Sequence, residues 1–221
     1  IDHPYFNGLT LYQDGQVVTS QKLSEQFNKM RWPAQKEFQT QAIEIYKADF
    51  KFFIDELTKL NEDANSIFYQ RLDLNRIAVM GHSAGGTASI EFCRIDSRCK
   101  AAINLDGWYD QVIGNEPIKQ PLLLIFAEKS LEVSDPLPEY LKRKELTREQ
   151  YFEREENIIQ HRKKLCDTPN CKTAIIPGAT HADFEDTMLL KWPFRAWNAA
   201  DAYDILKQIN GHIVRFLEDS I

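Results

Sequence analysis

Short apolar runs alternate with amphipathic stretches through most of the chain. Four runs are nearly continuous in apolar residues, which is typical of strands buried on both faces of a parallel sheet. They cover residues 76–81, 100–107, 121–128 and 172–178. Apolar residues recur at every third or fourth position from Ala34 to Leu60, from Ala84 to Cys93 and from Ala199 to Leu217, as in one-sided helices. The alternation predicts an α/β fold with a mostly parallel sheet and flanking helices.

One segment interrupts this alternation. The stretch from Pro136 to Asn170 is dense in charge and only sparsely apolar. Thr147 and Gln150 have the spacing of a helical capping box. We expect one or two mostly solvated helices inserted between strands, which form either a plain surface excursion or a lid over a functional site.

The first strand runs into the pentapeptide Gly81-His82-Ser83-Ala84-Gly85, and a helical pattern starts directly after it. A strand, the pattern G-x-S-x-G and a helix, in this order, form the nucleophile elbow of α/β-hydrolases. The serine of such a turn has a strained backbone, and small neighbours let strand and helix approach closely. We therefore predict Ser83 as a nucleophile and the backbone amide of Ala84 as an oxyanion donor. The alternative is an ordinary tight loop, because the five-residue pattern alone is common.

A serine nucleophile at neutral pH needs a base. Of the five histidines, His181 lies just after the last strand and can reach the strand ends where Ser83 is expected. The other four are terminal, within the elbow or in helical patterns: His3, His82, His161 and His212. We predict His181 as the base.

The base in turn needs an orienting carboxylate, and position alone leaves two choices. Asp106 ends the strand after the nucleophile strand, while Glu128, Glu132 and Asp135 follow the next strand along the chain. Either location can deliver a carboxylate to the base. The alternative for Asp106 is a carboxylate that only caps the strand end or a helix.

Length and charge exclude several function classes. The 221 residues suffice for one substantial core, so one domain is expected. A net charge of −6, with no dense basic stripe, argues against nucleic acid as a partner. The longest apolar run, Leu122 to Ala127, is far shorter than a membrane-spanning helix requires, so no transmembrane segment is expected.

The four cysteines fall into two local pairs, Cys93 with Cys99 and Cys166 with Cys171. Three connectivities are open to four cysteines, and buried free thiols are a further alternative. Neither pair has a histidine at ligand spacing, so we expect no metal site, and nothing implies an organic cofactor. Two local disulfides would place the protein in an oxidising compartment, secreted or periplasmic.

The motifs GHSAGG, NLDGW and GATHADF, in this order after RIAVM, resemble those of the plasma-type platelet-activating-factor acetylhydrolases and their bacterial and fungal relatives. The resemblance implies an α/β-hydrolase fold. It also implies Ser83 as nucleophile, Asp106 as orienting acid, His181 as base and the Ala84 amide in the oxyanion hole, which decides between the carboxylates. Pro136 to Asn170 departs from the family pattern as an insertion, so substrate preference does not carry over.

The resemblance further implies that parts of the fold precede this sequence. In such hydrolases an earlier strand ends in a His-Gly loop that donates a second oxyanion amide, and other strands come before it. We therefore expect residues 1–221 to be the C-terminal part of one α/β-hydrolase domain. An N-terminal segment or a second polypeptide would then complete the sheet and the oxyanion hole, since the nucleophile strand would otherwise have an uncovered edge.

Together these features predict a serine hydrolase that cleaves carboxylic esters through an acyl-enzyme, with small or short-acyl esters or phospholipid sn-2 esters as substrates. Five aromatic residues are candidates for an acyl or lipid pocket: Trp108, Tyr109, Trp192, Phe194 and Trp197. The alternatives are a dienelactone-hydrolase-like or peptidase-like enzyme, a catalytically inert binding module with the same fold, and an inactive cleavage fragment.

Overall fold

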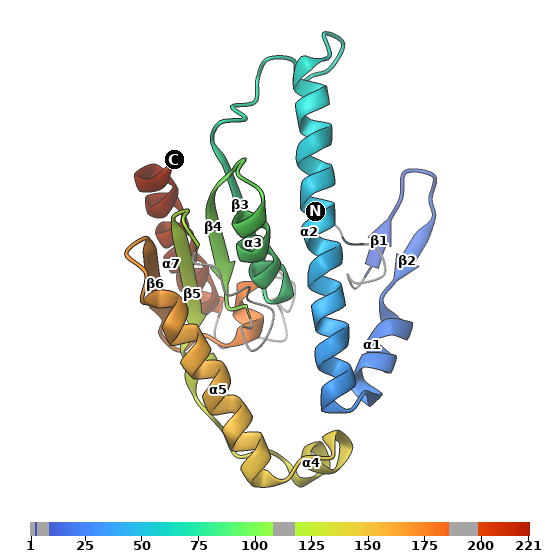
Figure 1. The fold of residues 1–221 in the computed structure, drawn as a ribbon, viewed down its shortest axis with the longest axis vertical. Coiled ribbons are helices and arrows are strands. Elements are labelled where there is room, and N and C mark those ends of the chain that lie inside the picture. The colour runs from blue at the N-terminus through green and yellow to red at the C-terminus, as the bar shows by residue number, and fades with distance from the viewer. Residues whose placement is uncertain (1–2, 4–8, 108–117, 186–198) are drawn as a thin grey trace.

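A four-stranded parallel sheet forms the centre of the protein (Figure 1). The computed structural model describes residue 3 and residues 9–107, 118–185 and 199–221. Within these, the sheet has the order β3-β4-β5-β6. The strands are β3 (Ile77–His82), β4 (Cys99–Leu105), β5 (Leu122–Ala127) and β6 (Cys171–Ile176). All four predicted strands are confirmed.

Helices cover both faces of this sheet. Helix α3 (Ala84–Ile95) packs on β3 and β4, and the long helix α2 (Trp32–Glu62) packs on α3 (Figure 1). Helix α7 (Ala199–Ser220) contacts β4, β5 and β6, and its buried residues belong to the core on the opposite face. The predicted helical stretches are therefore confirmed as the two outer layers of an α/β fold.

The continuous apolar runs result from this double coverage. In β5, Leu122 and Leu124 face the core under α2 and α3, whereas Leu123 and Ile125 face the core under α7. Successive side chains of a strand point to opposite faces, so burial on both faces requires an apolar residue at every position. No residue of β5 is exposed.

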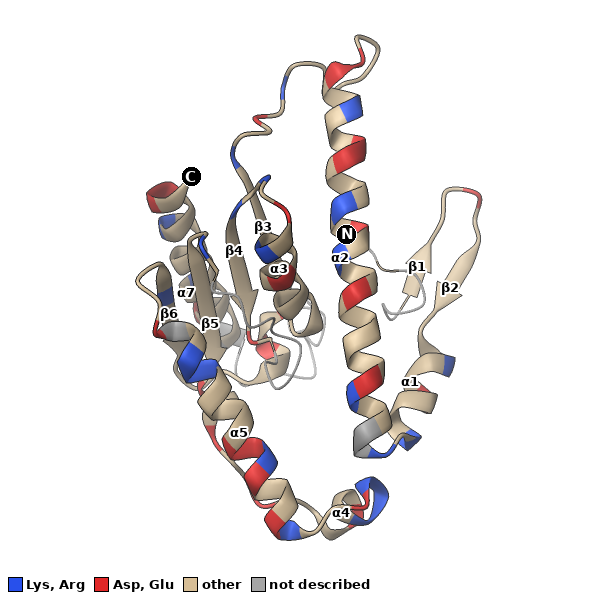
Figure 2. Cartoon of the chain, viewed as in Figure 1, with Lys and Arg blue, Asp and Glu red and all other residues tan. Residues whose placement is uncertain are grey.

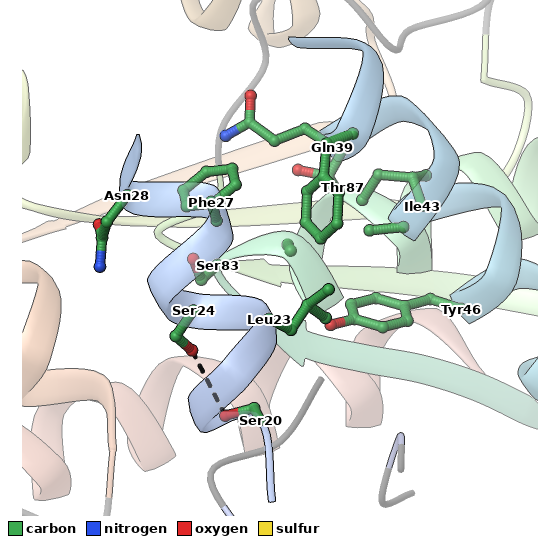
Figure 3. Close-up of a pocket in the computed structure, with 13 residues that line it drawn as sticks. Ser20, Leu23, Ser24, Phe27, Asn28, Gln39, Ile43, Tyr46, Ser83 and Thr87 are labelled. Carbon is green, nitrogen blue, oxygen red and sulfur yellow. Dashed lines mark hydrogen bonds between the residues drawn. The ribbon is translucent and has the colours of Figure 1, made fainter. Parts of the chain in front are cut away.

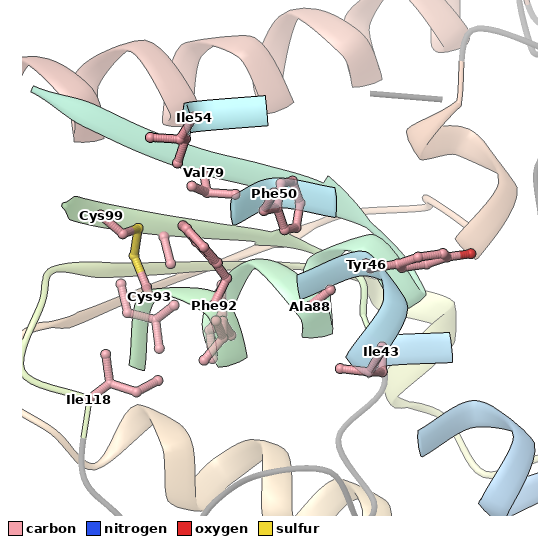
Figure 4. Close-up of a cluster of buried hydrophobic side chains, with 14 of the residues drawn as sticks. Ile43, Tyr46, Phe50, Ile54, Val79, Ala88, Phe92, Cys93, Cys99 and Ile118 are labelled. Carbon is pink, nitrogen blue, oxygen red and sulfur yellow. A yellow bond between two sulfur atoms is a disulfide. The ribbon is translucent and has the colours of Figure 1, made fainter. Parts of the chain in front are cut away.

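The core under α2 and α3 contains a disulfide between Cys93 and Cys99 (Figure 4). Both residues are fully buried, and their Cα atoms are 5.0 Å apart. The bond joins the last turn of α3 to the first residue of β4, and it confirms the first predicted pair. The side chain of Cys166 lies outside the described residues, so its pairing with Cys171 remains a prediction.

The charged insertion consists of two helices, α4 (Pro138–Lys144) and α5 (Arg148–Cys166). The predicted capping box is present, because the Thr147 side chain accepts from the Gln150 amide and the Gln150 side chain accepts from the Thr147 amide. Lys, Arg, Asp and Glu are dense along α4 and α5, whereas the central strands carry few charges (Figure 2). Helix α5 contacts β6, and α4 extends away from the sheet towards α1 (Figure 1).

The sequence patterns did not reveal the elements before α2. Strands β1 (Leu9–Leu11) and β2 (Val17–Thr19) form an antiparallel hairpin, followed by helix α1 (Gln21–Lys29). Three-residue strands are too short for a periodic pattern to be recognised. Within the described residues, no helix is both long and apolar enough to cross a membrane.

Candidate active site

Ser83 occupies a sharp turn between β3 and α3. Its backbone has φ 55° and ψ −124°, a conformation that side-chain-bearing residues rarely adopt. Two glycines make the turn possible: a Cβ on Gly81 would clash with the Gly85 backbone, and one on Gly86 would lie 2.5 Å from Asn104 Oδ1. A Cβ on Gly85 would meet nothing within 4 Å, so the steric requirement falls on Gly81 and Gly86.

Asp106 follows the C-terminal end of β4 and is fully buried. Three donors surround its carboxylate. Oδ1 accepts from the Ala127 amide at 3.1 Å, while Oδ2 accepts from Ser130 Oγ at 2.5 Å and from a ring nitrogen of His181 at 2.7 Å. Together these three hydrogen bonds fix the position and orientation of the carboxylate.

His181 lies at the start of the 3-10 helix η2 (His181–Phe184). The preceding residue, Thr180, and Asp183 form a capping box that fixes this turn. Two contacts tie the approaching loop to the segment after β5: the Lys129 amide donates to the Ala179 carbonyl, and the Gly178 amide donates to the Glu128 carboxylate. The imidazole is thus held by neighbouring strand ends.

The structure brings Ser83, His181 and Asp106 into one relay. His181 Nδ1 is 2.7 Å from Asp106 Oδ2, and His181 Nε2 is 3.1 Å from Ser83 Oγ. Because the carboxylate can only accept, Nδ1 carries the proton and Nε2 is left to accept from the serine hydroxyl. This arrangement can take a proton from Ser83 and stabilise the resulting imidazolium.

The rival carboxylates have other partners among the described residues. Glu128 accepts from the Gly178 amide, Glu132 pairs with Lys129, and Asp135 pairs with Arg148. Asp106 is the carboxylate that contacts His181.

A family model for platelet-activating factor acetylhydrolase, isoform II, matches residues 55–220, which include all three groups of the relay. The chain belongs to this family. Among curated relatives, a platelet-activating factor acetylhydrolase from Gallus gallus is 32% identical over 119 residues, which cover 52% of this chain and 23% of the relative. The acetylhydrolase from Bos taurus is 29% identical over 119 residues, 52% of this chain and 21% of the relative.

The solved structure of a ferulic acid esterase from Streptomyces cinnamoneus is similar over 100% of this chain, with a TM-score of 0.64 and 21% identity. This likeness shows the α/β-hydrolase fold. The chain spans 57% of that esterase and less than a quarter of the two acetylhydrolases.

His82 is a site residue that sequence reasoning missed. Its Nε2 donates to the His181 backbone carbonyl at 3.0 Å, its Nδ1 lies 3.5 Å from Glu185 Oε1, and the rings of His82 and His181 are 4.5 Å apart. Burial, followed by the neighbouring His181, lowers the pKa of His82. Its position inside the elbow was a signal, but nothing in the sequence showed that it would contact His181, which follows β6, three strands along the sheet.

Ser130 was also missed. Its hydroxyl donates to the same Asp106 oxygen that contacts His181, and its carbonyl accepts from the buried guanidinium of Arg162 at 2.9 Å. The insertion is therefore linked to the relay through α5, which no local pattern in the sequence could reveal.

Two cavities with different linings lie beside the relay, and a third, beside β3, also includes Ser83 in its lining. The first, about 390 Å³, is lined by Ser83 and by mostly apolar residues of α1, α2 and α3 (Figure 3). The second, about 410 Å³, is lined by His181 and by both polar and apolar residues of α2, of the segment after β5 and of α4 and α5. The predicted pocket aromatics, Trp108, Tyr109, Trp192, Phe194 and Trp197, lie outside the described residues. No group of three or more metal-ligating side chains gathers within the described part of the chain.

Proposed function

We propose that this protein hydrolyses carboxylic esters through an acyl-enzyme on Ser83. The observation that carries the proposal is the relay Ser83 Oγ to His181 Nε2 at 3.1 Å and His181 Nδ1 to Asp106 Oδ2 at 2.7 Å. The names of its relatives, acetylhydrolases and a ferulic acid esterase, both describe ester cleavage. Short-acyl esters, phospholipid sn-2 esters among them, are the substrate class that the family suggests.

In the first half-reaction, Ser83 Oγ attacks the ester carbonyl while His181 Nε2 takes its proton. Asp106 orients the imidazole and stabilises its charged form. The tetrahedral intermediate collapses, the C–O bond to the alcohol breaks, and His181 protonates the departing alkoxide. In the second half-reaction, His181 activates water, which releases the acid and restores the serine.

The Ala84 amide is the proposed oxyanion donor. Ala84 is the first residue of α3, where backbone amides and the helix dipole favour negative charge. An amide donor in an oxyanion hole contributes about 10²–10³-fold to turnover.

We further propose that a segment outside the described residues, or a second polypeptide, pairs with β3 and supplies the second oxyanion donor. Strand β3 is an edge strand of the described sheet, and Met80 on it is 48% exposed. Beside it lies a cavity of about 400 Å³ lined by His3, Tyr46, Met80, Ser83 and Ala84, among others, next to the proposed donor. On this proposal the chain is the C-terminal part of one α/β-hydrolase domain.

The buried Cys93–Cys99 disulfide supports a secreted or periplasmic location, because such bonds persist in oxidising compartments. The insertion is proposed to act as a lid, since α4 and α5 line the cavity beside His181.

A fluorophosphonate probe tests the central proposal, because it reacts quickly only with a serine whose base and oxyanion hole are assembled. We expect labelling of Ser83, found by mass spectrometry of peptides, and loss of both labelling and ester turnover in Ser83→Ala. Ser97→Ala, a change at an exposed serine, is the matched control and keeps both. A folded protein that is neither labelled nor active would contradict the enzyme and favour the inert binding module. Intact mass of the native preparation shows whether a second polypeptide accompanies the chain.

A further inference from the structure

Apart from the cavity at the edge of β3, two cavities lie beside the relay, and they differ in which catalytic group they reach. The first includes Ser83 and Ala84 in its lining but not His181. The second includes His181 and Ser130 but not Ser83. Gln39 of α2 lines both and lies where they adjoin.

The proposed mechanism gives each side a different half of the ester. The acyl group becomes bonded to Ser83 Oγ and stays there after the first step. The alcohol oxygen must receive its proton from His181 Nε2, so the alcohol has to leave on the histidine side. The cavity at the serine therefore suits the acid, and the cavity at the histidine suits the alcohol.

Resting on the proposed function, we propose that the substrate is an ester of an apolar acid longer than acetate with a hydroxyl-rich alcohol, and that the two cavities bind these halves separately. The cavity at Ser83 is called the acyl chamber, and the cavity at His181 is called the alcohol chamber.

The acyl chamber has an apolar wall. Leu23 and Phe27 of α1 line it together with Ile43 of α2 (Figure 3). Phe38 and Ala42 of α2 also line it, and the rings of Phe27 and Phe38 are 5.4 Å apart. A volume of about 390 Å³ is in the range of pockets that hold whole small ligands, and an acetyl group alone would leave most of it empty. Burial of each further methylene in this wall favours longer acyl chains.

The alcohol chamber has a mixed lining, in which Val133, Ile158 and Ile159 add apolar surface to a larger number of polar residues. Tyr140 and Tyr151 present hydroxyls and ring faces, with the rings 5.9 Å apart, while Gln35 and Gln39 contribute amides. Arg154 donates to the Tyr140 hydroxyl and pairs with Glu155, so positive and negative charges both border the chamber. Closely spaced donors and acceptors beside aromatic faces suit an alcohol with several hydroxyls, which can both donate and accept.

Acyl-chain profiles test the first half of the proposal. We expect kcat/KM of the protein on p-nitrophenyl esters to rise from acetate to octanoate. Ala42→Phe fills the chamber and should lower kcat/KM for octanoate about tenfold relative to acetate. Phe27→Ala, which enlarges it, should shift the preference to still longer chains and covers the case that Ala42→Phe does not fold. Phe52→Ala, a change at an exposed residue of α2, the helix that also carries Ala42, should leave the profile unchanged.

Alcohol selectivity tests the second half. Glycerol monooctanoate should be cleaved with a higher kcat/KM than butyl octanoate, and Gln35→Leu should reduce that ratio at least about threefold. Equal kcat/KM for acetate and octanoate esters, or a ratio that Gln35→Leu leaves unchanged, would overturn the proposal although Ser83 is labelled by the fluorophosphonate. Absence of Ser83 labelling would instead overturn the enzyme itself, and the chamber assignment with it.

Discussion

The strands that carry the relay and the helices that wall the chambers are held in very different ways. No residue of β5 is exposed, and Asp106 is fully buried at the end of β4. By contrast, α1 contains no buried residue, and the one buried residue of α4 is Lys144. Local stability follows buried contacts, so the relay belongs to the most stable part of the molecule, whereas the chamber walls that α1 and α4 contribute belong to a more adaptable part.

The difference teaches where each property of the site is encoded. Proton transfer requires that Ser83, His181 and Asp106 keep their relative positions within tenths of an ångström. A sheet covered on both faces provides this rigidity. Acyl length and alcohol type depend on helices that can shift with little cost to the core. Variants beside the relay should therefore change kcat, and variants in the chamber walls should change KM.

The largest effect is expected at Ser130, on the sheet side. Ser130→Ala removes a 2.5 Å hydrogen bond to the Asp106 oxygen that orients His181. We expect kcat to fall about tenfold with little change in KM, because a hydrogen bond to a charged group is lost, whereas the alcohol chamber, which Ser130 lines, gains only the space of one oxygen atom.

Ser130→Thr keeps the hydroxyl and should restore kcat. Lys129→Ala, which removes the exposed neighbour, is the control for general disturbance of this turn. A kcat for Ser130→Ala equal to that of the parent would show that Ser130 does not position the acid.

A smaller effect is expected at Lys144, on the wall side. Its Nζ donates to the Met30 carbonyl at 3.1 Å and lies 5.8 Å from the centre of the Phe27 ring, which joins the insertion to the acyl chamber. Burial lowers the pKa of the Lys144 ammonium, because it removes water from the charged group. The hydrogen bond to Met30 and the contact with the Phe27 ring partly replace that water.

Lys144→Met keeps the length of the side chain but removes the donor and the charge. We expect KM for long-acyl esters to rise about threefold while kcat on acetate esters stays unchanged, because α1 and α4 are no longer joined at a fixed place. Lys142→Met, at an exposed position of the same helix, is the matched control. A fall in kcat on acetate esters would contradict the separation of the two regions, since the chamber wall would then support the relay as well.

The two regions also differ in how well they could be predicted from sequence. The four strands, the elbow, Ser83 and His181 were visible, because a doubly buried strand and a strained turn leave strong local patterns. Position alone left Asp106 level with the carboxylates after the next strand, and only the resemblance to a family decided for it. The chambers were not visible: Leu23 and Phe27 lie in a short helix after a hairpin of three-residue strands, and their partners on α2 are far away in sequence. Ser130 and His82 act through contacts between separate strand ends, which periodicity cannot show.

The smallest effect is expected at His82, and it separates stability from catalysis within the sheet region. Its pKa, lowered by burial, lies below the ordinary value of 6.5. Between the two values the unfolded state binds more protons than the folded state, so His82 makes the free energy of unfolding rise with pH up to about 6.5 and fall as the pH drops below it. His82→Gln can keep the donor to the His181 carbonyl without titrating, so urea unfolding should show a flatter dependence on pH below about 6.5. The side chains of Glu185, His181 and Asp106 face this ring and are present in both proteins. An identical slope for the two proteins would mean that His82 is as easily protonated in the fold as in the unfolded chain, and the sheet side of the site would then be more open to water than its burial indicates.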